Sequence, residues 1–334
     1  MTQRQRISLA TSDQQRGITV DLLNRGASIA GIRVHGVGNL SEVDTVLKYS
    51  SDADYDVDPF YLGSTVGPVA NRLDGGRLDL LSGSYQLALN ELDRQNLLHG
   101  GELGLHQQTF QPSPTRDSHR LVFSLALPHL SDGFPGERLV TVRYELIDPT
   151  SLQCDFMAST DRPTVMNLAN HAYFNLGGPL EAHELRIFAT GHTPTNDRQI
   201  PTGAIASLSE TTDEGNTLDF HDWRAIRDQA LDHNFVLIEG SKLREAASLR
   251  LEESDLQLDV LSTQPALQVY TGDGLTSPFT PRDGICLEAQ GFPDAPNQPG
   301  FPSICIEPGQ TYRQRTVYRF GEIADAEGGS QAPV

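Results

Sequence analysis

Hydrophobic and polar side chains alternate with a period of two through much of this 334-residue chain. The clearest runs cover residues 18–22, 85–89, 121–127, 140–146 and 256–260. In a β-strand, successive side chains point to opposite faces, so this alternation is typical of strands with one face in the core and one in water. The pattern predicts many half-buried strands.

Turn-forming residues separate these runs, and helical periodicity is scarce. Glycine-containing turns are expected at residues 74–76, 82–83, 132–133, 177–178 and 283–284, and the best helical segment is short, around 220–226. Strands and helices do not alternate as they would in a parallel sheet. We therefore expect an all-β fold, a large antiparallel β-sandwich (supersandwich) with few short helices.

The chain has no internal repeat and no clear linker, so one domain over residues 1–320 is the simpler organisation. All-β folds often exceed about 200 residues as a single unit. Small, polar and acidic residues make up 321–334, which we expect to be a flexible tail. Because proline cannot donate to a ladder, the prolines of 291–302 predict a stiff loop rather than a strand.

The net charge is −19, from 44 acidic and 25 basic residues. We read most of it as a solubility feature, but it would repel phosphates and anionic lipids, so neither a nucleic acid nor a membrane is expected as a partner. The three cysteines lack metal-site spacing. Sparse cysteines, a polar N-terminus and the lack of a long apolar run predict a cytoplasmic protein. A monomer is the default expectation, and a dimer is possible.

Polar residues capable of chemistry stand inside otherwise apolar, strand-like segments. They are Asn71, Arg72, His99, His171, Asp232, Gln268 and Glu288. Each alone has an ordinary structural explanation: His99 precedes two glycines and could close a hairpin, and His171 could be a satisfied core histidine. Glu288 could be a surface charge, but on a buried strand the pKa of its carboxyl group would rise.

Together these residues fit the chemistry of a cyclic sugar. Opening a cyclic hemiacetal requires one proton delivered to the ring oxygen and one removed from the anomeric hydroxyl. A histidine and a carboxylate on opposite sides of the anomeric carbon can do both. The other residues would supply the hydrogen bonds that sugar hydroxyls require. Because the set is scattered along the chain, only the fold can bring it together.

Several segments resemble, in the same order, the motifs of the aldose 1-epimerase family, also called galactose mutarotases. They are residues 67–73, 96–101, 167–178, 232–235, 268–272, 287–297 and 308–312. Residues 96–101 read Asn-Leu-Leu-His-Gly-Gly and 232–235 read Asp-His-Asn-Phe, as the family's motifs do. The resemblance spans roughly residues 61–320.

This resemblance implies an isomerase that interconverts the α and β anomers of free aldoses without a cofactor or metal. It implies His171 as the general acid toward the ring oxygen and Glu288 as the base on the anomeric hydroxyl. His99 would help bind or polarise the reacting end. The residues implied for the remaining hydroxyls are Asn71, Arg72, Tyr173, Asp232 and Gln268.

The chain departs from the family's motifs at four places. Pro68 stands in place of an arginine, Ala172 of a serine and Gly291 of a histidine, and the stretch Gly-Phe-Asp-Lys reads Gly-Leu-His-Gln at 104–107. None removes a residue assigned to catalysis. We expect these departures to bear on which sugar fits or on how the pocket is covered.

Four other functions fit parts of this pattern less well. A carbohydrate-binding sandwich without catalysis would need neither an acid nor a base, and a sugar-phosphate epimerase would need more cations than Arg72. A glycosidase would place two carboxylates, here Asp232 and Glu288, across one bond and leave the histidines unexplained. A metal enzyme would usually show closer histidine spacing. The sequence favours the epimerase and leaves its preferred aldose open.

Overall fold

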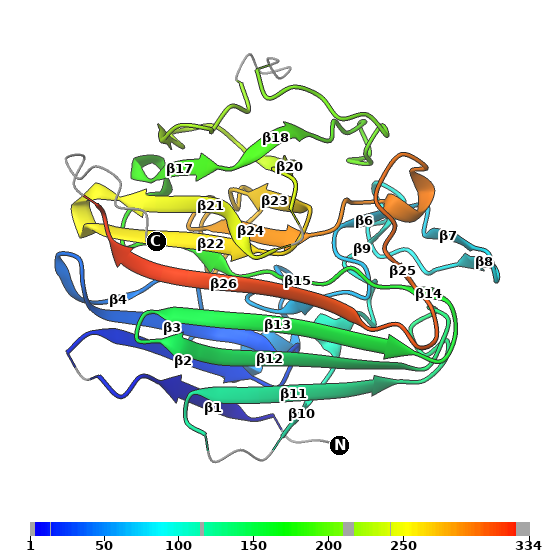
Figure 1. Ribbon diagram of the computed structural model, residues 1–334, viewed down its shortest axis with the longest axis horizontal. Coiled ribbons are helices and arrows are strands. Elements are labelled where there is room, and N and C mark those ends of the chain that lie inside the picture. The colour runs from blue at the N-terminus through cyan, green and yellow to red at the C-terminus, as the bar shows by residue number, and fades with distance from the viewer. Residues whose placement is uncertain (1–3, 14, 114–116, 210–216, 241, 325–334) are drawn as a thin grey trace.

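The structure is a computed structural model that describes residues 4–13, 15–113, 117–209, 217–240 and 242–324. Strands dominate these residues, and every pair of named strands is antiparallel (Figure 1). The described helices are all short 3₁₀ helices: η1 (Asp52–Asp56), η2 (Leu105–Gln107), η3 (Leu180–Ala182), η4 (Glu252–Ser254) and η5 (Ala295–Asn297). The predicted all-β antiparallel sandwich with few short helices is confirmed.

A nine-stranded sheet forms one layer and lies at the front of Figure 1. Its strands, in spatial order, are β10 (Gln111–Pro112), β11 (Arg120–Leu127), β12 (Arg138–Asp148), β13 (Ser151–Thr160), β26 (Tyr312–Glu322), β22 (Leu256–Ser262), β21 (Arg244–Leu251), β17 (Glu184–Ile187) and β19 (Arg224–Ala225). The C-terminal strand β26 lies in the middle, so the sheet joins segments that are far apart in the sequence.

Two smaller sheets pack behind this layer. One is β1 (Arg6–Ala10), β2 (Gly17–Leu23), β3 (Ser28–Val37) and β4 (Leu40–Asp44); the other is, in spatial order, β16 (Tyr173–Phe174), β24 (Ile285–Gln290), β23 (Ala266–Tyr270), β20 (Asp232–Leu237) and β18 (Ala189–His192). One hydrophobic cluster draws buried residues from all three sheets, for example Val20, Val142 and Leu287. That shared core makes the three sheets one sandwich.

Four two-stranded sheets complete the architecture. They are β5 (Thr65–Val66) with β15 (Ala169–Asn170), β6 (Arg72–Asp74) with β9 (Asn96–Leu98), β7 (Arg77–Leu80) with β8 (Gly83–Gln86), and β14 (Thr164–Val165) with β25 (Cys305–Ile306). Several of these short strands border the candidate site. They are held by tertiary contacts, because strands of two or three residues have little stability of their own.

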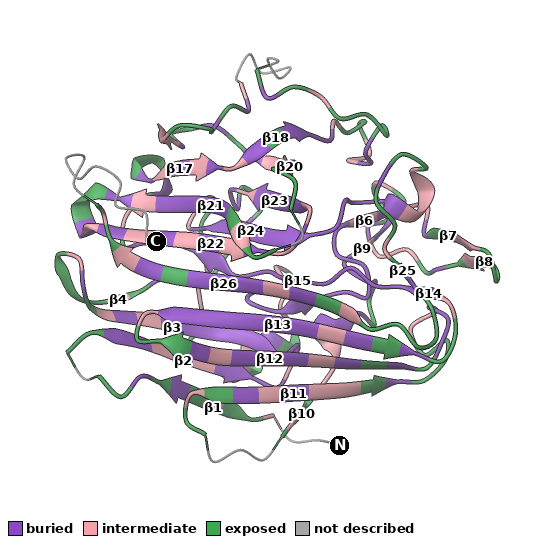
Figure 2. Cartoon of the chain, viewed as in Figure 1, coloured by how far each residue is buried: buried purple, intermediate pink, exposed green. Residues whose placement is uncertain are grey.

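Side-chain alternation explains most of the long strands. In β12, Val140, Val142 and Tyr144 are fully buried, while the residues between them are partly exposed. Figure 2 shows these alternating bands on several strands of the front sheet. The runs predicted at 18–22, 121–127, 140–146 and 256–260 lie in β2, β11, β12 and β22.

Two local predictions are wrong. Residues 220–226 form no helix; they contain a bend and the edge strand β19. The carbonyl of Phe220 accepts from the N–H of Ile187, and the N–H of Ile226 donates to the carbonyl of His183, so neighbouring segments take backbone groups that a helix would use internally. The strand predicted at 85–89 ends at Gln86, after which the N–H of Leu87 donates to the carbonyl of Gly76.

The loop predicted at 291–302 is largely irregular, as expected, and contains only the single turn η5. The first two residues of the expected tail, 321 and 322, belong to β26, and residues 325–334 lie outside the described part of the chain. None of the described helices has the length and apolar character needed to cross a membrane. The three cysteines are unpaired.

Candidate active site

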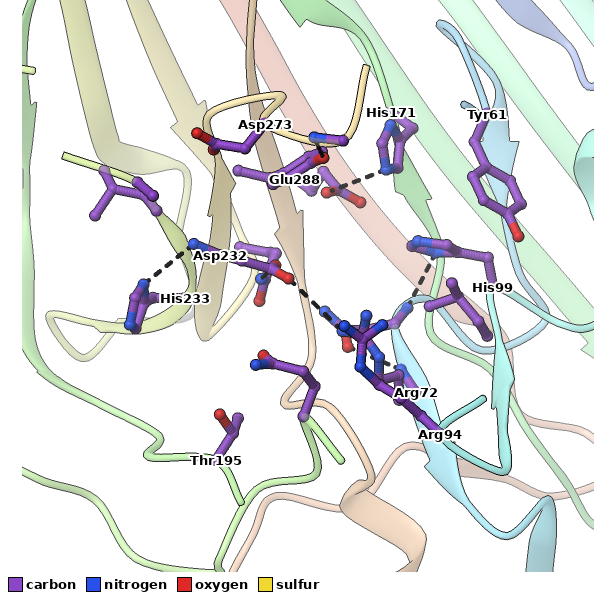
Figure 3. Close-up of a pocket in the computed structure, with 18 of the residues that line it drawn as sticks. Tyr61, Arg72, Arg94, His99, His171, Thr195, Asp232, His233, Asp273 and Glu288 are labelled. Carbon is purple, nitrogen blue, oxygen red and sulfur yellow. Dashed lines mark hydrogen bonds and ion pairs between the residues drawn. The ribbon is translucent and has the colours of Figure 1, made fainter. Parts of the chain in front are cut away.

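A cavity of about 1050 Å³ opens beside the five-stranded sheet (Figure 3). All eight residues that the sequence analysis selected line it: Asn71, Arg72, His99, His171, Tyr173, Asp232, Gln268 and Glu288. The fold therefore brings together residues that lie more than 200 positions apart in the chain. Their roles in binding and catalysis remain predictions.

The register of the five-stranded sheet places three of these residues on one face. Gln268 of β23 lies opposite Glu288 of β24, and Asp232 of β20 lies two residues from the position opposite Gln268. Residues opposite one another, or two apart on one strand, share a face. The alternate positions, such as Phe235 and Leu267, point into the hydrophobic core, so burial of the apolar face fixes the polar one toward the cavity.

Asn71 and His99 meet at the ends of the paired strands β6 and β9. Both have left-handed backbone conformations, with φ of 63° and 52°; Asn and His adopt this region more readily than most residues. The N–H of Asn71 donates to Nδ1 of His99 at 3.2 Å, and the N–H of His99 donates to the carbonyl of Asn71 at 3.0 Å. Because Nδ1 accepts, Nε2 must carry the proton of a neutral His99. His99 is thus both a turn residue and a hydrogen-bond donor in the cavity wall.

His171 and Glu288 point toward one another in the cavity (Figure 3). Nε2 of His171 lies 3.6 Å from Oε1 of Glu288, and their side chains are only 6% and 2% exposed. His171 follows β15 and is fixed through its backbone, because its N–H donates to the carbonyl of Ser64 and its carbonyl accepts from the N–H of Gly63. The Sγ of Cys286 lies 3.5 Å from Nδ1 on the other side of the ring.

Burial controls the electrostatics of this pair. It raises the pKa of Glu288 well above its ordinary value; the charge of Asp232 adds to the rise and Arg72 opposes it. Burial also lowers the pKa of His171 to about 4. Loss of water disfavours the charged form of each group. The pair therefore holds one proton at neutral pH, and burial favours its location on Glu288.

A network of hydrogen bonds holds the opposite wall. Nε and Nη2 of Arg72 both donate to the carboxylate of Glu91 at 2.9 Å, while Nη1 lies 3.9 Å from Oδ2 of Asp232. Nε2 of Gln268 donates to Oδ1 of Asp232 at 2.6 Å. Nη1 of Arg72 and Oε1 of Gln268 take part in none of these hydrogen bonds and are a donor and an acceptor suited to sugar hydroxyls.

Glu91 was not selected from the sequence, although it fixes Arg72. It is 9% exposed and also accepts from the side chains of Arg94 and Asn96. The signal was present, since a carboxylate in the apolar stretch 87–92 precedes the Asn-Leu-Leu-His-Gly-Gly motif by a few residues. A buried cation such as Arg72 needs such a partner.

Replacing Glu91 with glutamine is expected to raise KM for the sugar about tenfold, with kcat changed less than about threefold. The change removes the charge that holds Arg72, and a charge-assisted hydrogen bond contributes about 1.5–3 kcal/mol. Steady-state kinetics on protein with an intact thermal transition measures the effect. The control is Asp93→Asn. The side chain of Asp93 is 75% exposed, and its carboxylate comes no nearer than 3.9 Å to the guanidinium of Arg94, so it makes no hydrogen bond there. An unchanged KM in Glu91→Gln would contradict this account of Arg72.

Tyr173 serves the site differently from the other polar residues. Its hydroxyl donates to the carbonyl of Phe60 at 3.2 Å, and its ring centroid lies 5.1 Å from that of His171. The phenol oxygen keeps lone pairs that can accept from a sugar hydroxyl. Tyr173 therefore contributes both packing against His171 and one acceptor.

The donor set fits a metal ion poorly. His99, His171 and Glu288 offer ligand atoms within 4.8 Å of one another. However, coordination through Nδ1 of His99 would break its bond from the N–H of Asn71, and coordination through Nε2 would require loss of the ring's proton. Catalysis without a metal stays a prediction, which activity after treatment with EDTA tests.

A family model described as aldose 1-epimerase matches residues 8–319. The chain belongs to the aldose 1-epimerase family. The galactose mutarotase of Rattus norvegicus is 33% identical to it over 329 residues, which cover 92% of each chain. The aldose 1-epimerase of Escherichia coli (strain K12) is 30% identical over 336 residues, covering 93% of this chain and 94% of that protein. A solved aldose epimerase homologue from C. elegans superposes with a TM-score of 0.88 at 26% identity, covering 96% of this chain and 100% of that one.

Three of the four departures from the aldose 1-epimerase motifs lie behind the cavity wall. Pro68, Ala172 and Gly291 are all buried, and none of the three lines the cavity. At Gly291 an added Cβ would lie 3.0 Å from the side chain of Ile304 and 3.2 Å from Oδ1 of Asn167, so the backbone passes too closely for a larger residue without rearrangement. These positions therefore affect the sugar only through the residues in front of them.

Proposed function

We propose that this protein interconverts the α and β anomers of free aldoses of the glucose or galactose type by acid/base-catalysed opening and closure of the sugar ring. His171 is assigned as the general acid toward the ring oxygen and Glu288 as the base on the anomeric hydroxyl. The observation that carries the proposal is the 3.6 Å approach of Nε2 of His171 to Oε1 of Glu288 in a cavity lined with hydrogen-bonding groups. Acid and base in one cavity are what hemiacetal opening requires.

The proton balance of the reaction follows from the pair. Ring opening begins with carboxylate Glu288 and protonated His171: Glu288 takes the anomeric hydroxyl proton, the bond from C1 to the ring oxygen breaks, and His171 protonates that oxygen. The product is an open-chain aldehyde beside neutral His171 and protonated Glu288. Rotation about the C1–C2 bond presents the other face of the carbonyl, and closure returns both protons. The pair is unchanged after each turnover.

Burial favours the protonation state that accompanies the open chain. The raised pKa of Glu288 and the lowered pKa of His171 both stabilise the neutral pair relative to the charged pair. The charged pair forms by transfer of one proton from Glu288 to His171, and a sugar hydroxyl donating to the carboxylate would promote it. Ring opening then relieves the cost of two buried charges. Each group of this kind contributes on the order of 10²–10⁴ to the rate.

The remaining residues hold and polarise the sugar. The Nε2 proton of His99 is available to donate to the anomeric oxygen, which becomes the carbonyl oxygen of the open chain. Arg72, Asn71, Asp232, Gln268 and Tyr173 provide donors and acceptors for the other hydroxyls. Both arginines that line the cavity, Arg72 and Arg94, contact Glu91, so neither is an uncompensated cation suited to a phosphate dianion. This favours a neutral aldose.

The first test is polarimetry. Fresh α-D-glucose or α-D-galactose should reach its equilibrium rotation faster with the protein than without it, in proportion to protein concentration. The spontaneous rate in the same buffer is the control. Unchanged equilibration of every common aldose would contradict the proposed function and favour a binding protein that has lost catalysis.

The pH dependence of kcat/KM, which reports the acid and base of the free enzyme, is expected to be flat through neutrality and to fall on the acid side near pH 4. Activity requires one proton on the pair, and the second proton binds as the pH drops through the pKa of His171, about 4. The basic limb should lie well above the ordinary range of a carboxyl group, because burial raises the pKa of Glu288. Polarimetric rates, corrected for spontaneous mutarotation, measure both limbs. An acid limb at the ordinary histidine value of 6.5 would contradict burial as the cause of a lowered pKa of His171.

A further inference from the structure

The ring of Tyr61 packs against three histidines of the site. Its centroid lies 4.6 Å from that of His99, 4.7 Å from His106 and 5.8 Å from His171. His99 and His171 in turn meet edge to face, 5.1 Å apart at 86°. We infer that Tyr61 is a positioning residue that holds the two cavity imidazoles in their mutual geometry and keeps water from His171. The inference rests on the proposed function and extends it to a residue outside the acid/base pair.

The backbone gives Tyr61 a fixed position. Its φ is 57°, a left-handed conformation that is uncommon for an aromatic residue and requires support from its surroundings. The carbonyl of Tyr61 accepts from the N–H of Ser64 at 3.0 Å. Upstream, the carboxylate of Asp58 accepts from the N–H groups of Phe60 and Leu62, on both sides of Tyr61. The ring of Tyr61 therefore projects from a turn that is held by hydrogen bonds before and after it in the chain.

The same turn is bonded directly to His171. The N–H of Gly63 donates to the carbonyl of His171 at 3.0 Å, and the N–H of His171 donates to the carbonyl of Ser64 at 2.9 Å. Nδ2 of Asn170 also donates to the carbonyl of Gly63 at 2.7 Å. Segment 61–64 thus fixes the backbone of His171 through hydrogen bonds and its side chain through the ring of Tyr61.

His106 supports Tyr61 from the far side. It lies in η2, is only 8% exposed, and meets the ring of Tyr61 at 69°. Its Nδ1 is buried without a hydrogen-bond partner among the described residues, and burial lowers its pKa to about 4. His106 is therefore neutral and packs as a flat, largely apolar group. The rings of His106, Tyr61 and His171 thus form a continuous series of edge and tilted contacts that ends at the cavity.

Two consequences follow for catalysis. Proton transfer requires the imidazoles to be held closely, since a displacement of about 1 Å at a reacting group can lower a rate on the order of 100-fold. In addition, the ring of Tyr61 excludes water from one side of His171, which helps keep the pKa of that histidine low. Both effects depend on the aromatic ring and not on the phenol hydroxyl.

The experiment compares Tyr61→Leu with Tyr61→Phe by polarimetry with D-galactose across the pH range, per folded molecule. Tyr61→Leu is expected to lower kcat about 10- to 100-fold, to change KM less than about threefold, and to move the acid limb of kcat/KM from about pH 4 toward 6.5. Tyr61→Phe keeps the ring and is expected to retain most of kcat and the acid limb of the unchanged protein. His106→Ala removes the ring that packs against Tyr61 but keeps Tyr61 itself. It should lower kcat and raise the acid limb, each by less than Tyr61→Leu does.

A matched control separates positioning from stability. Tyr55→Leu truncates a tyrosine that is 3% exposed and does not line the cavity, and it should lower the melting temperature without moving the acid limb. If Tyr61→Leu fails to fold, His106→Ala and Tyr61→Phe carry the test. An unmoved acid limb in Tyr61→Leu, or in His106→Ala where that variant stands in, would overturn the inference. So would a Tyr61→Phe as impaired as Tyr61→Leu. Lack of catalysis by the unchanged protein would instead contradict the proposed function.

Discussion

Replacing Glu288 with glutamine is expected to lower kcat by about 10³–10⁴ while the fold is kept. The amide has the shape of the carboxyl group but cannot accept the anomeric proton, so the only catalysis left is that of the acid and the bound geometry. KM should change little, because hydroxyl binding is assigned to the opposite wall. Polarimetric kcat and KM measure the effect, and a Glu288→Gln protein that retained more than a tenth of kcat would exclude Glu288 as the base.

This substitution should not destabilise the protein at neutral pH. The pKa of Glu288 is raised in the folded state. Above the pKa of the unfolded chain, the unfolded state loses this proton and the folded state retains it, so stability falls as the pH rises. Glutamine removes that dependence, and the melting temperature should be equal or higher. Glu245→Gln is the matched control, since Glu245 is 49% exposed on the nine-stranded sheet and should affect neither kcat nor folding.

Replacing His171 with alanine is expected to lower kcat by about 10²–10⁴, with partial recovery on addition of free imidazole. The ring oxygen loses its proton donor, while the truncation leaves a space in which imidazole can lie beside Glu288. Because Glu288 carries the single proton of the pair, imidazole should bind in its neutral form, take that proton and then act as the acid. Rescue should therefore strengthen as the pH rises through the pKa of imidazole. Polarimetry with increasing imidazole, corrected for its own catalysis, measures the recovery.

His183 provides the control for loss of a buried imidazole. It is fully buried, its Nε2 accepts from the N–H of Leu176 at 2.9 Å, and its Nδ1 lies 3.0 Å from the carbonyl of Pro179. His183→Ala should lower stability, because it leaves these backbone groups unpaired, but not kcat per folded molecule. Equal losses of kcat in His171→Ala and His183→Ala would show that the effect of His171 is structural.

The contrast between these two histidines shows what sequence reasoning can achieve here. The ordinary alternative for His171 was a buried histidine with both ring nitrogens hydrogen-bonded and no role in catalysis. His183 is a histidine of that kind. The histidine side chains alone do not distinguish the two, because partners of His171 such as Ser64 and Glu288 come from distant segments of the chain. The resemblance of residues 167–178 to the family's motif indicated His171 as a candidate, and the fold places it beside the carboxyl group of Glu288.

The long strands were predictable because their burial follows a local alternation, as in β11, β12 and β22. The short strands that border the site were not, since two-residue pairs such as β15 with β5 carry no measurable period. In the segment 220–226, Phe220 and Ile226 are both fully buried, but their backbone groups bond to other segments instead of to one another in a helix. Tertiary hydrogen bonding overrode local pattern there.

Within the site, the groups assigned to sugar binding were easier to predict than those that support them. Glu91, Tyr61 and His106 act through Arg72 and the two cavity histidines, so no hydroxyl chemistry marks them in the sequence. Their importance depends on distances such as the 4.6 Å between the rings of Tyr61 and His99. Only a folded structure supplies these.

The central claim is that His171 and Glu288 flank the anomeric centre of a bound aldose. A crystal structure of Glu288→Gln with D-galactose tests it most directly. The account predicts the ring oxygen within about 3.2 Å of Nε2 of His171, and the anomeric hydroxyl within about 3.2 Å of the side-chain amide at position 288. A sugar bound with its anomeric carbon toward Arg72, and with neither of those contacts, would contradict the account.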